Sequence, residues 1–214
     1  NPYRSVFQLW KEKTGQAEPE EKDSEFTHFG SLLEPVIKRE FARRTGLKVR
    51  NRYAILQSEE YPFMLADLDG IIYEDHKLCI FEAKTASAYK KEVWEQGVPL
   101  EYLYQIQHYM AVTGAEKTYI AALVGGNHFL YHEVCGDEAM IQDIIQLEKD
   151  FWENHVLTGK EPQADGSKAT ADYLEDTYGT SNGKIVELPA ESLALFEHYD
   201  SISQQLAQLK EEKE

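Results

Sequence analysis

The stretch MLADLDGIIYEDHKLCIFEAK, residues 64–84, decides the fold of this chain. Two runs rich in apolar and β-branched residues, Met64 to Tyr73 and Leu78 to Lys84, flank the turn-like sequence Glu74-Asp75-His76. Such runs on either side of a short polar turn predict two antiparallel strands. The Asp69-Gly70 pair lies inside the first run, and the sequence FEAK ends the second.

The second strand carries charge where apolar side chains are expected. Residues two apart project from the same face of a strand, so Glu82 and Lys84 are expected to stand side by side while Ala83 points away. An unpaired buried charge costs on the order of several kcal/mol. If Asp69 ends the first strand, its carboxylate faces Glu82, and the two repel each other unless a hard cation lies between them.

Magnesium is the natural occupant of such a site, because it prefers carboxylate oxygens, and manganese is expected to substitute for it. A bound ion of this kind lowers the pKa of a water molecule and neutralises charge on a phosphate oxygen. Lys84 would assist the attacking water or the transition state as a compact point charge. The pattern therefore predicts one or two divalent ions beside Asp69, Glu82 and Lys84.

Elements on both sides of this hairpin complete an α/β pattern. Apolar residues recur at spacings of three and four from Ser31 to Arg44, and Gly46 follows, which predicts a helix. The expected order is helix, three strands, helix, two strands, helix, over residues 31–44, 52–57, 64–73, 78–84, 99–113, 119–124, 128–134 and 138–155. This order predicts an α/β fold in which helices flank a central mixed β-sheet.

The chain changes composition after Gly159. Residues 160–183 are polar and rich in turn-forming residues, and a final helix is expected from about Glu191 to Lys210. Its apolar residues alternate by four and three as in a coiled-coil seam, but packing on its own domain is the favoured interpretation. We therefore expect one domain over residues 1–165 and an acidic C-terminal extension with an amphipathic helix over residues 166–214.

Composition restricts the class of protein. With 214 residues and 42% hydrophobic content, the chain can bury one sizeable core. The two cysteines, Cys79 and Cys135, are too few for a four-cysteine zinc or iron–sulfur site. No run approaches the roughly 18 apolar residues that a membrane span needs. These observations favour a soluble protein of the reducing cytoplasm, without a membrane partner.

The net charge of −16 is unevenly distributed. The segment from Val36 to Arg52 holds seven basic residues and a single acid, Glu40. Counterion release depends on local contacts, so a basic strip on an acidic body can bind phosphates, although a solvated helix face has the same composition. The candidate phosphate-binding residues are Arg39, Arg43, Arg44, Lys48, Arg50 and Arg52.

The spacing of Asp69, Glu82 and Lys84 resembles the PD-(D/E)xK nuclease superfamily. Further motifs lie along residues 1 to about 165: NPYRSVFQLWKEKTG at residues 1–15, Gly30 with Glu34, Asp69-Gly70, FEAKTAS at 81–87, YLYQIQHYMAVTG at 102–114 and Phe151-Trp152. Through these motifs the chain resembles one branch of the superfamily, the lambda-exonuclease and YqaJ-type viral recombinase nucleases. The resemblance implies a restriction-endonuclease-like core with an extra C-terminal helix.

Membership in this branch implies a metal centre. Asp69 and Glu82, together with the backbone carbonyl of Ala83, would hold the principal metal ion. Glu34 would reach a metal ion or its water from the preceding helix, and Lys84 would be the catalytic lysine.

Further roles are expected next to this centre. Gln105 matches the family glutamine that orients the nucleophile or the scissile phosphate, and Gln107 remains the alternative. Thr85 and Ser87, just past the lysine, are candidates for hydrogen bonds to DNA phosphates, although polar strand ends are common without such a role.

The resemblance implies a magnesium-dependent exonuclease that hydrolyses linear double-stranded DNA from a free end, with 5′-to-3′ polarity expected. Its partner would be a single-strand annealing protein in phage-type recombination, in a bacterial host of a phage or prophage. Similar proteins assemble into rings, typically trimers, so a homo-oligomer is expected. The alternatives are an endonuclease or nickase on the same core and a catalytically silent fold that only binds DNA or protein, which the intact Asp69, Glu82 and Lys84 set disfavours.

Overall fold

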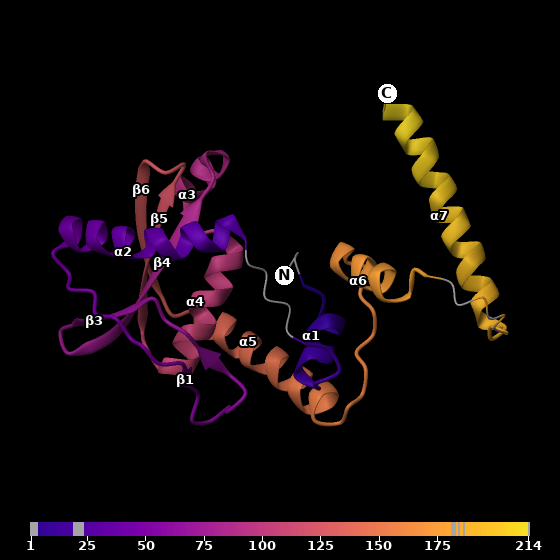
Figure 1. The fold of residues 1–214 in the computed structure, drawn as a ribbon, viewed down its shortest axis with the longest axis horizontal. Helices are drawn as coiled ribbons and strands as arrows, with labels where there is room; N and C mark the ends of the chain where they lie inside the picture. The colour runs from indigo at the N-terminus through magenta and orange to yellow at the C-terminus, as the bar shows by residue number, and fades with distance from the viewer. Residues whose placement is uncertain (1–3, 19–23, 181–182, 184, 186, 214) are drawn as a thin grey trace. The chain divides into compact units, whose positions relative to one another are not determined.

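The computed structural model describes residues 4–18, 24–180, 183, 185 and 187–213 (Figure 1). The chain divides into two compact units, residues 1–171 and residues 172–214. The boundary expected from composition, between residues 165 and 166, lies just before helix α6 (Lys168–Tyr178), and the division by contacts falls inside that helix. Each unit is described by itself.

A four-stranded mixed sheet forms the centre of the first unit (Figure 1). Its strand order is β3-β4-β5-β6, with β4 and β5 parallel and the two outer pairs antiparallel. The predicted mixed sheet is therefore confirmed. The strands are β3 (Gly70–Glu74), β4 (Lys77–Ala86), β5 (Lys117–Val124) and β6 (His128–Cys135), and a separate antiparallel pair is formed by β1 (Leu56–Gln57) and β2 (Leu65–Ala66).

The prediction of one strand from Met64 to Tyr73 was wrong. β2 ends at Ala66 and β3 begins at Gly70, so Asp67 to Asp69 form a break between two different sheets. Aspartate is a poor strand former because its short side chain competes for backbone hydrogen bonds. Asp69 shows this competition, since its Oδ2 accepts the backbone N–H of Ala83 at 2.7 Å.

The strand predicted over residues 52–57 is likewise reduced to the two residues of β1. The segment before it instead lies against Gly70. Arg50 and Ile71 exchange two backbone hydrogen bonds of 2.9 Å each. A Cβ atom at Gly70 would lie 2.6 Å from Val49 Cγ1, so only glycine fits this close approach. Glycine at position 70 thus allows residues 49 and 50 to lie close against the start of β3.

The main helices have clear sequence signals at their ends. In α2 (Glu25–Thr45), Ser24 Oγ accepts the N–H of Thr27, so the helix starts earlier than the predicted Ser31. Gly46 ends α2 with a φ of 76°, as its position in the sequence predicts. The other helices of the first unit are α1 (Val6–Lys13), η1 (Ala88–Lys90), α3 (Lys91–Gln96), α4 (Leu100–Thr113), α5 (Glu138–Phe151) and the π-helical turn η2 (Trp152–Val156).

The sheet separates two apolar layers. Cys79 and Phe81 of β4 pack with Ile37 and Phe41 of α2. The alternate residue Ile80 packs with Met110 of α4. Side chains on a strand alternate between its faces, so Glu82 and Lys84 continue the row of Ile80 on the α4 side of the sheet. This placement brings them towards α4.

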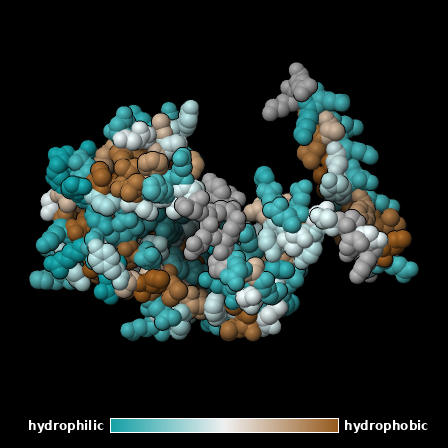
Figure 2. All heavy atoms as spheres, viewed as in Figure 1, coloured by the Kyte–Doolittle hydropathy of each residue, from teal (hydrophilic) through white to brown (hydrophobic). Residues whose placement is uncertain are grey.

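The second unit contains the rest of α6 and the amphipathic helix α7 (Glu191–Lys213). The apolar seam residues of α7 are exposed, and Figure 2 shows apolar groups along this helix. These residues are Leu195, Tyr199, Ile202, Leu206 and Leu209. The expected packing of this face on the same chain stays a prediction. Within the described ranges, no helix is both long and apolar enough to cross a membrane.

Candidate active site

Strand β4 places Glu82 and Lys84 on one face, as the period of a strand predicts. Lys84 Nζ donates to Glu82 Oε1 at 2.6 Å. Gln105 Nε2, from α4, donates to the same oxygen at 3.2 Å. Glu82 is only 2% exposed, yet its second oxygen, Oε2, is buried and has no hydrogen-bond partner among the described residues. The site therefore contains a carboxylate oxygen whose loss of water is not compensated.

Asp69 lies next to this glutamate. Gly70 pairs with Phe81 across β3 and β4, so the next pair in the same register is Asp69 and Glu82. The hydrogen bond from the N–H of Ala83 fixes one Asp69 oxygen against the edge of β4. The structure thus brings the two carboxylates together at the point where the hairpin pattern predicts them.

Both carboxyl groups are poorly placed to carry negative charge. The pKa of Glu82 is raised to about 7, mainly by burial; the charges of Asp69 and Glu34 contribute to the rise, and Lys84 opposes it. Burial also raises the pKa of Asp69, and the hydrogen bond from Ala83 opposes that rise. Added positive charge between the two groups would therefore be favourable.

Glu34 reaches the same region from α2, but it is paired with a lysine. Lys38 Nζ, one helical turn further on, donates to Glu34 Oε1 at 2.9 Å. Glu34 still acts on the other two carboxylates, since its charge raises the pKa of both Asp69 and Glu82. The sequence reasoning missed Lys38 as part of this cluster, although the Glu-xxx-Lys spacing on a predicted helix was available as a signal.

Two carboxylates of the site, Asp69 and Glu82, are placed to bind a hard cation. In the part of the chain that the structure describes, no group of three His, Cys, Asp or Glu side chains is close enough together to hold a metal ion. Asp69 and Glu82 remain, and the unpartnered Oε2 of Glu82 marks where positive charge is lacking. Oxygen-only ligands of this kind suit magnesium or manganese. The backbone carbonyl of Ala83 and the carboxylate of Glu34 stay predicted ligands.

Helix α4 turns its two glutamines in different directions. Gln105 Nε2 bonds Glu82 and also donates to the hydroxyl of Tyr109 at 2.9 Å. Gln107 is buried elsewhere: its Nε2 donates to the carbonyl of Cys135, and its Oε1 accepts the N–H of Asp137. Of the two alternatives, Gln105 is therefore the one beside Glu82, and Gln107 joins α4 to the segment after β6.

Two tyrosines of α4, Tyr102 and Tyr109, lie beside Glu82, Lys84 and Gln105. Lys84 Nζ lies 5.1 Å from the ring centroid of Tyr102, which in turn stacks on Trp94. Burial and, after it, the charge of Glu82 together raise the pKa of Tyr109 to about 12. Tyr102, Gln105 and Tyr109 lie one and two turns apart on one face of α4, so their spacing of three and four was the signal that could have identified Tyr102.

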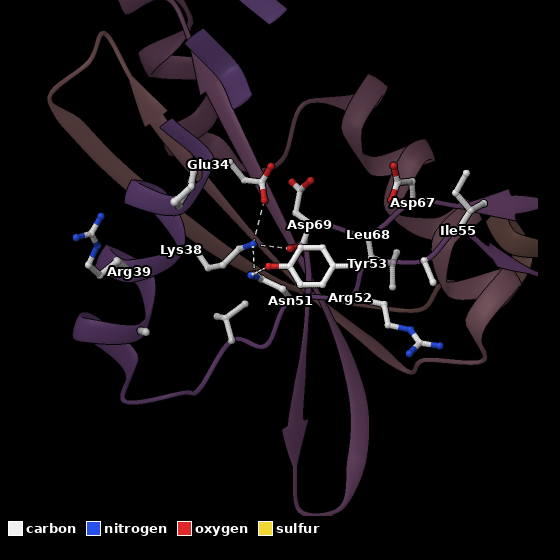
Figure 3. A pocket seen from close by; sticks show the side chains of 14 residues that line it. Glu34, Lys38, Arg39, Asn51, Arg52, Tyr53, Ile55, Asp67, Leu68 and Asp69 are labelled. Atoms are coloured by element: carbon white, nitrogen blue, oxygen red, sulfur yellow. Dashed lines mark hydrogen bonds and ion pairs between the residues drawn. The ribbon is translucent and has the colours of Figure 1, made fainter. Parts of the chain in front are cut away.

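These groups line a cleft of about 600 Å³. A second depression of about 830 Å³, here called the basic hollow, lies between α2 and residues 49–55 (Figure 3). Both depressions are lined by Glu34, Asp67 and Asp69, so they adjoin at Asp69. Lys38, Arg39, Asn51, Arg52 and Tyr53 line the basic hollow but not the cleft.

The predicted phosphate-binding residues fall into two groups. Arg39 and Arg52 are exposed and line the basic hollow. Arg43 and Arg44 both bond Glu40 instead, with nitrogen–oxygen distances of 2.6 to 2.8 Å. The remaining residues lie outside both depressions: Lys48 is exposed, and the guanidinium of Arg50 lies 5.5 Å from the ring centroid of Tyr73.

The polar residues after Lys84 also differ. Thr85 lines the cleft. Ser87 is exposed, does not line the cleft and precedes η1 without capping it through its side chain. Their roles as phosphate contacts stay predictions.

Solved structures share this architecture at low sequence identity. An alkaline exonuclease from Laribacter hongkongensis, LHK-Exo, is 18% identical and matches 81% of this chain and 83% of its own, with a TM-score of 0.56. A structure described as LHK-Exo in complex with dAMP gives a TM-score of 0.58 at 19% identity over the same shares. A phage-related exonuclease from Haemophilus somnus 129PT is 13% identical, covers 72% of this chain and 82% of its own, and gives 0.55.

The fold and the site together define a restriction-endonuclease-like α/β protein with an acidic, lysine-bearing cleft. The family of YqaJ-like viral recombinase domains matches residues 1–116, and this chain belongs to that family. The uncharacterized protein YqaJ of Bacillus subtilis (strain 168) is 41% identical over 214 residues, covering 98% of this chain. The chain spans 66% of that relative's length. The family resemblance expected from the motifs is confirmed.

Proposed function

We propose that this protein is a metal-dependent DNA nuclease with its active centre at Asp69, Glu82 and Lys84. The observation that carries the proposal is the buried Glu82 Oε2, which has no hydrogen-bond partner among the residues that the structure describes and lies beside a second carboxylate and a lysine. A buried, uncompensated anion destabilises the fold, so its presence in a cleft favours a functional reason. Membership in a viral recombinase family supports a reaction on DNA.

Asp69 and Glu82 would hold magnesium or manganese. When bound, such an ion activates water and neutralises charge on the phosphate. Lys84 Nζ lies between Glu82 and the ring face of Tyr102, which holds the ammonium at the cleft wall for contact with the attacking water or the phosphate. Gln105 has bonds to Glu82 and Tyr109 on the same wall, and it would orient the reacting groups.

DNA would pass over Asp69, where the cleft meets the basic hollow (Figure 3). Arg39 and Arg52 supply exposed positive charge beyond this point, and Thr85 offers a hydroxyl within the cleft. Phosphates flanking the cleaved one would bind these groups. Local contacts of this kind explain how a chain with a net charge of −16 can act on a polyanion.

We further propose that the enzyme is an exonuclease on linear double-stranded DNA, with 5′-to-3′ polarity. It would work with a single-strand annealing protein during phage-type recombination in a bacterial host cytoplasm. The solved structures with this fold that are described as exonucleases support this choice.

A homo-oligomer, such as a trimeric ring around the duplex, would impose the need for a free end. An apolar surface supports a contact between copies. Phe29, Leu32 and Val36 are exposed on α2, and Figure 2 shows apolar side chains gathered over α2 and β6.

The test compares a linear duplex fragment with the same DNA as a relaxed closed circle, in Mg²⁺ and then in EDTA. We expect nucleotides to be released from the linear fragment only, and only with the metal ion. A Glu82→Gln protein serves as the inactive control. Rapid cutting of the circle would replace the exonuclease with an endonuclease, whereas no cutting of either substrate would favour a silent binding fold.

A further inference from the structure

His108 of helix α4 connects three elements of the first unit near the candidate site. Its Nε2 is bonded to the backbone carbonyl of Leu65 in β2 at 2.9 Å, and its Nδ1 is bonded to Glu148 Oε1 in α5 at 2.8 Å. The side chain is only 19% exposed, so little water competes for these bonds. His108 therefore ties α4 both to the strand that precedes Asp69 and to α5.

Both partners of His108 accept hydrogen bonds, so both ring nitrogens must donate. A carbonyl and an ionised carboxylate have no proton to give, and a ring with two N–H groups is the positively charged imidazolium. Burial lowers the pKa of His108, but the hydrogen bond and the charge of Glu148 outweigh burial and the Leu65 carbonyl adds to their effect, so this pKa lies above its usual value. Further acidic groups line the same depression of about 770 Å³ between α4 and α5: Glu101, Asp137 and Asp143. The surroundings therefore favour the charged ring.

The bond to Leu65 matters because Asp69 follows a junction between two sheets. β2 pairs with β1, whereas β3 and β4 belong to the four-stranded sheet, so strand hydrogen bonds do not fix β2 against β4. Leu68 packs in the same apolar cluster as Met110 of α4, but such contacts are non-directional and oppose separation more than sliding. The bond from His108 is directional, and it fixes the chain against α4 four residues before Asp69.

The same helix also holds the second carboxylate of the pair. Gln105, one turn before His108, donates to Glu82 Oε1 at 3.2 Å. Helix α4 thus contacts Glu82 directly and the segment that carries Asp69 through His108. Two ligands that share an ion must be held to within about 0.5 Å of the binding geometry, so a slide of β2 along α4 would disturb the pair.

We propose that His108, as an imidazolium held by Glu148, is a positioning residue that keeps Asp69 opposite Glu82 by anchoring the Leu65 carbonyl to α4. It contacts neither the metal ion nor DNA, and it acts through the backbone between residues 65 and 69. This inference rests on the proposed nuclease function, but it concerns how the two carboxylates are held and not whether DNA is cut.

The experiment compares two neutral variants of the full chain that each keep one of the two bonds. The amide nitrogen of His108→Gln takes the place of Nε2 and can donate to Leu65, whereas that of His108→Asn takes the place of Nδ1 and can donate only to Glu148. Electron paramagnetic resonance gives the Mn²⁺ affinity without DNA, and cleavage of linear duplex DNA gives kcat and KM. We expect His108→Asn to bind Mn²⁺ at least about tenfold more weakly and to lose kcat to a similar extent with KM unchanged, while His108→Gln retains most of both.

A merely structural role predicts something different, because each variant loses one bond and both should then be impaired to the same extent. His76→Asn is the matched control: His76 is exposed in the turn before β4, where its φ of 67° suits asparagine, and we expect wild-type behaviour. If His108→Asn loses its folded circular dichroism spectrum, His108→Ser, which reaches neither partner, takes its place with the same expectation.

Nitrogen NMR of the wild-type ring tests the charge directly. At roughly pH 6.5, the ordinary pKa of histidine, we expect His108 to be mainly imidazolium. A neutral ring at that pH, or equal Mn²⁺ affinities of the two His108 variants, would overturn the inference while leaving the nuclease proposal intact. Equal Mn²⁺ binding by the wild type and Glu82→Gln would overturn the metal centre itself.

Discussion

Two glutamate–lysine pairs lie next to Asp69, one on strand β4 and one on helix α2. In the pair Glu82–Lys84, the glutamate side chain is 3% exposed and keeps one oxygen without a partner among the described residues. In the pair Glu34–Lys38, the glutamate side chain is 33% exposed, and the lysine has its full set of acceptors. In the strand pair, the carboxylate of Glu82 keeps an oxygen without a hydrogen bond, whereas in the helix pair every N–H of the Lys38 ammonium group has an acceptor. The same two residue types therefore differ in whether their hydrogen bonds are complete.

The difference follows from local geometry. A spacing of two on a strand puts both side chains against the layer between sheet and helix, where water is excluded. A spacing of four on a helix lets the longer lysine bend back and contact other chain segments. A third carboxylate, Glu40 on α2, pairs with two arginines. Arg43 and Arg44 hold the pKa of Glu40 at about 2, but their side chains are 68% and 42% exposed, and ion pairs at such a surface add little stability.

The largest expected effect is on the rate of DNA cleavage, which should fall much more when Glu82 is replaced than when Glu34 is replaced. Glu82→Gln removes a proposed metal ligand, and we expect the rate on linear duplex DNA to fall by at least roughly a hundredfold. Lys84→Ala should cause a loss of the same order. Glu34→Gln, which in this structure contacts a lysine, should lose about tenfold or less. Initial rates of nucleotide release under saturating Mg²⁺ measure this. Equal losses for Glu34→Gln and Glu82→Gln would show that both bind the metal ion.

The second effect is on stability in the absence of metal. The pKa of Glu82 is raised from 4.5 to about 7. Between these values the unfolded chain is ionised while the folded chain keeps its proton, so stability falls as pH rises, by on the order of 3 kcal/mol in total. Below pH 4.5 the effect is absent, and above about pH 7 it is complete.

Urea unfolding in EDTA at pH 5 and pH 8.5 measures this contribution. We expect the wild type to lose stability at the higher pH relative to Glu82→Gln, whose side chain cannot ionise. A difference between the two proteins that does not change with pH would mean that Glu82 ionises normally in the folded chain.

The strand pair could be predicted from sequence, and the helix pair's role could not. The period of β4 and the turn before it place Glu82, Lys84 and Asp69 together without any knowledge of distant contacts. The three oxygen atoms that accept hydrogen bonds from Lys38 belong to residues 34, 51 and 69, which only the folded chain brings together. The choice between Gln105 and Gln107 likewise depended on how α4 is rotated against the sheet, because residues two apart on a helix face different directions. The break at Asp67 to Asp69 was missed because the side chain of Asp69 competes with the strand backbone, which an apolar pattern does not reveal.

The smallest expected effect concerns the arginines of the basic strip, and it extends the contrast between satisfied and unsatisfied charges. Arg43 and Arg44 are engaged by Glu40, whereas Arg39 and Arg52 are exposed at the basic hollow and have no hydrogen bond or ion pair within the described chain. A free guanidinium can bind a phosphate without first breaking an ion pair.

We therefore expect Arg39→Ala and Arg52→Ala each to reduce the slope of log affinity against log salt by roughly one. Arg43→Ala should change that slope less, because a phosphate would first have to displace the two hydrogen bonds between Arg43 and Glu40. Fluorescence anisotropy with a duplex end in Ca²⁺ at several salt concentrations measures the slopes. Equal slopes for all three variants and the wild type would mean that the DNA does not follow the basic hollow, and the path proposed over Asp69 would have to run elsewhere.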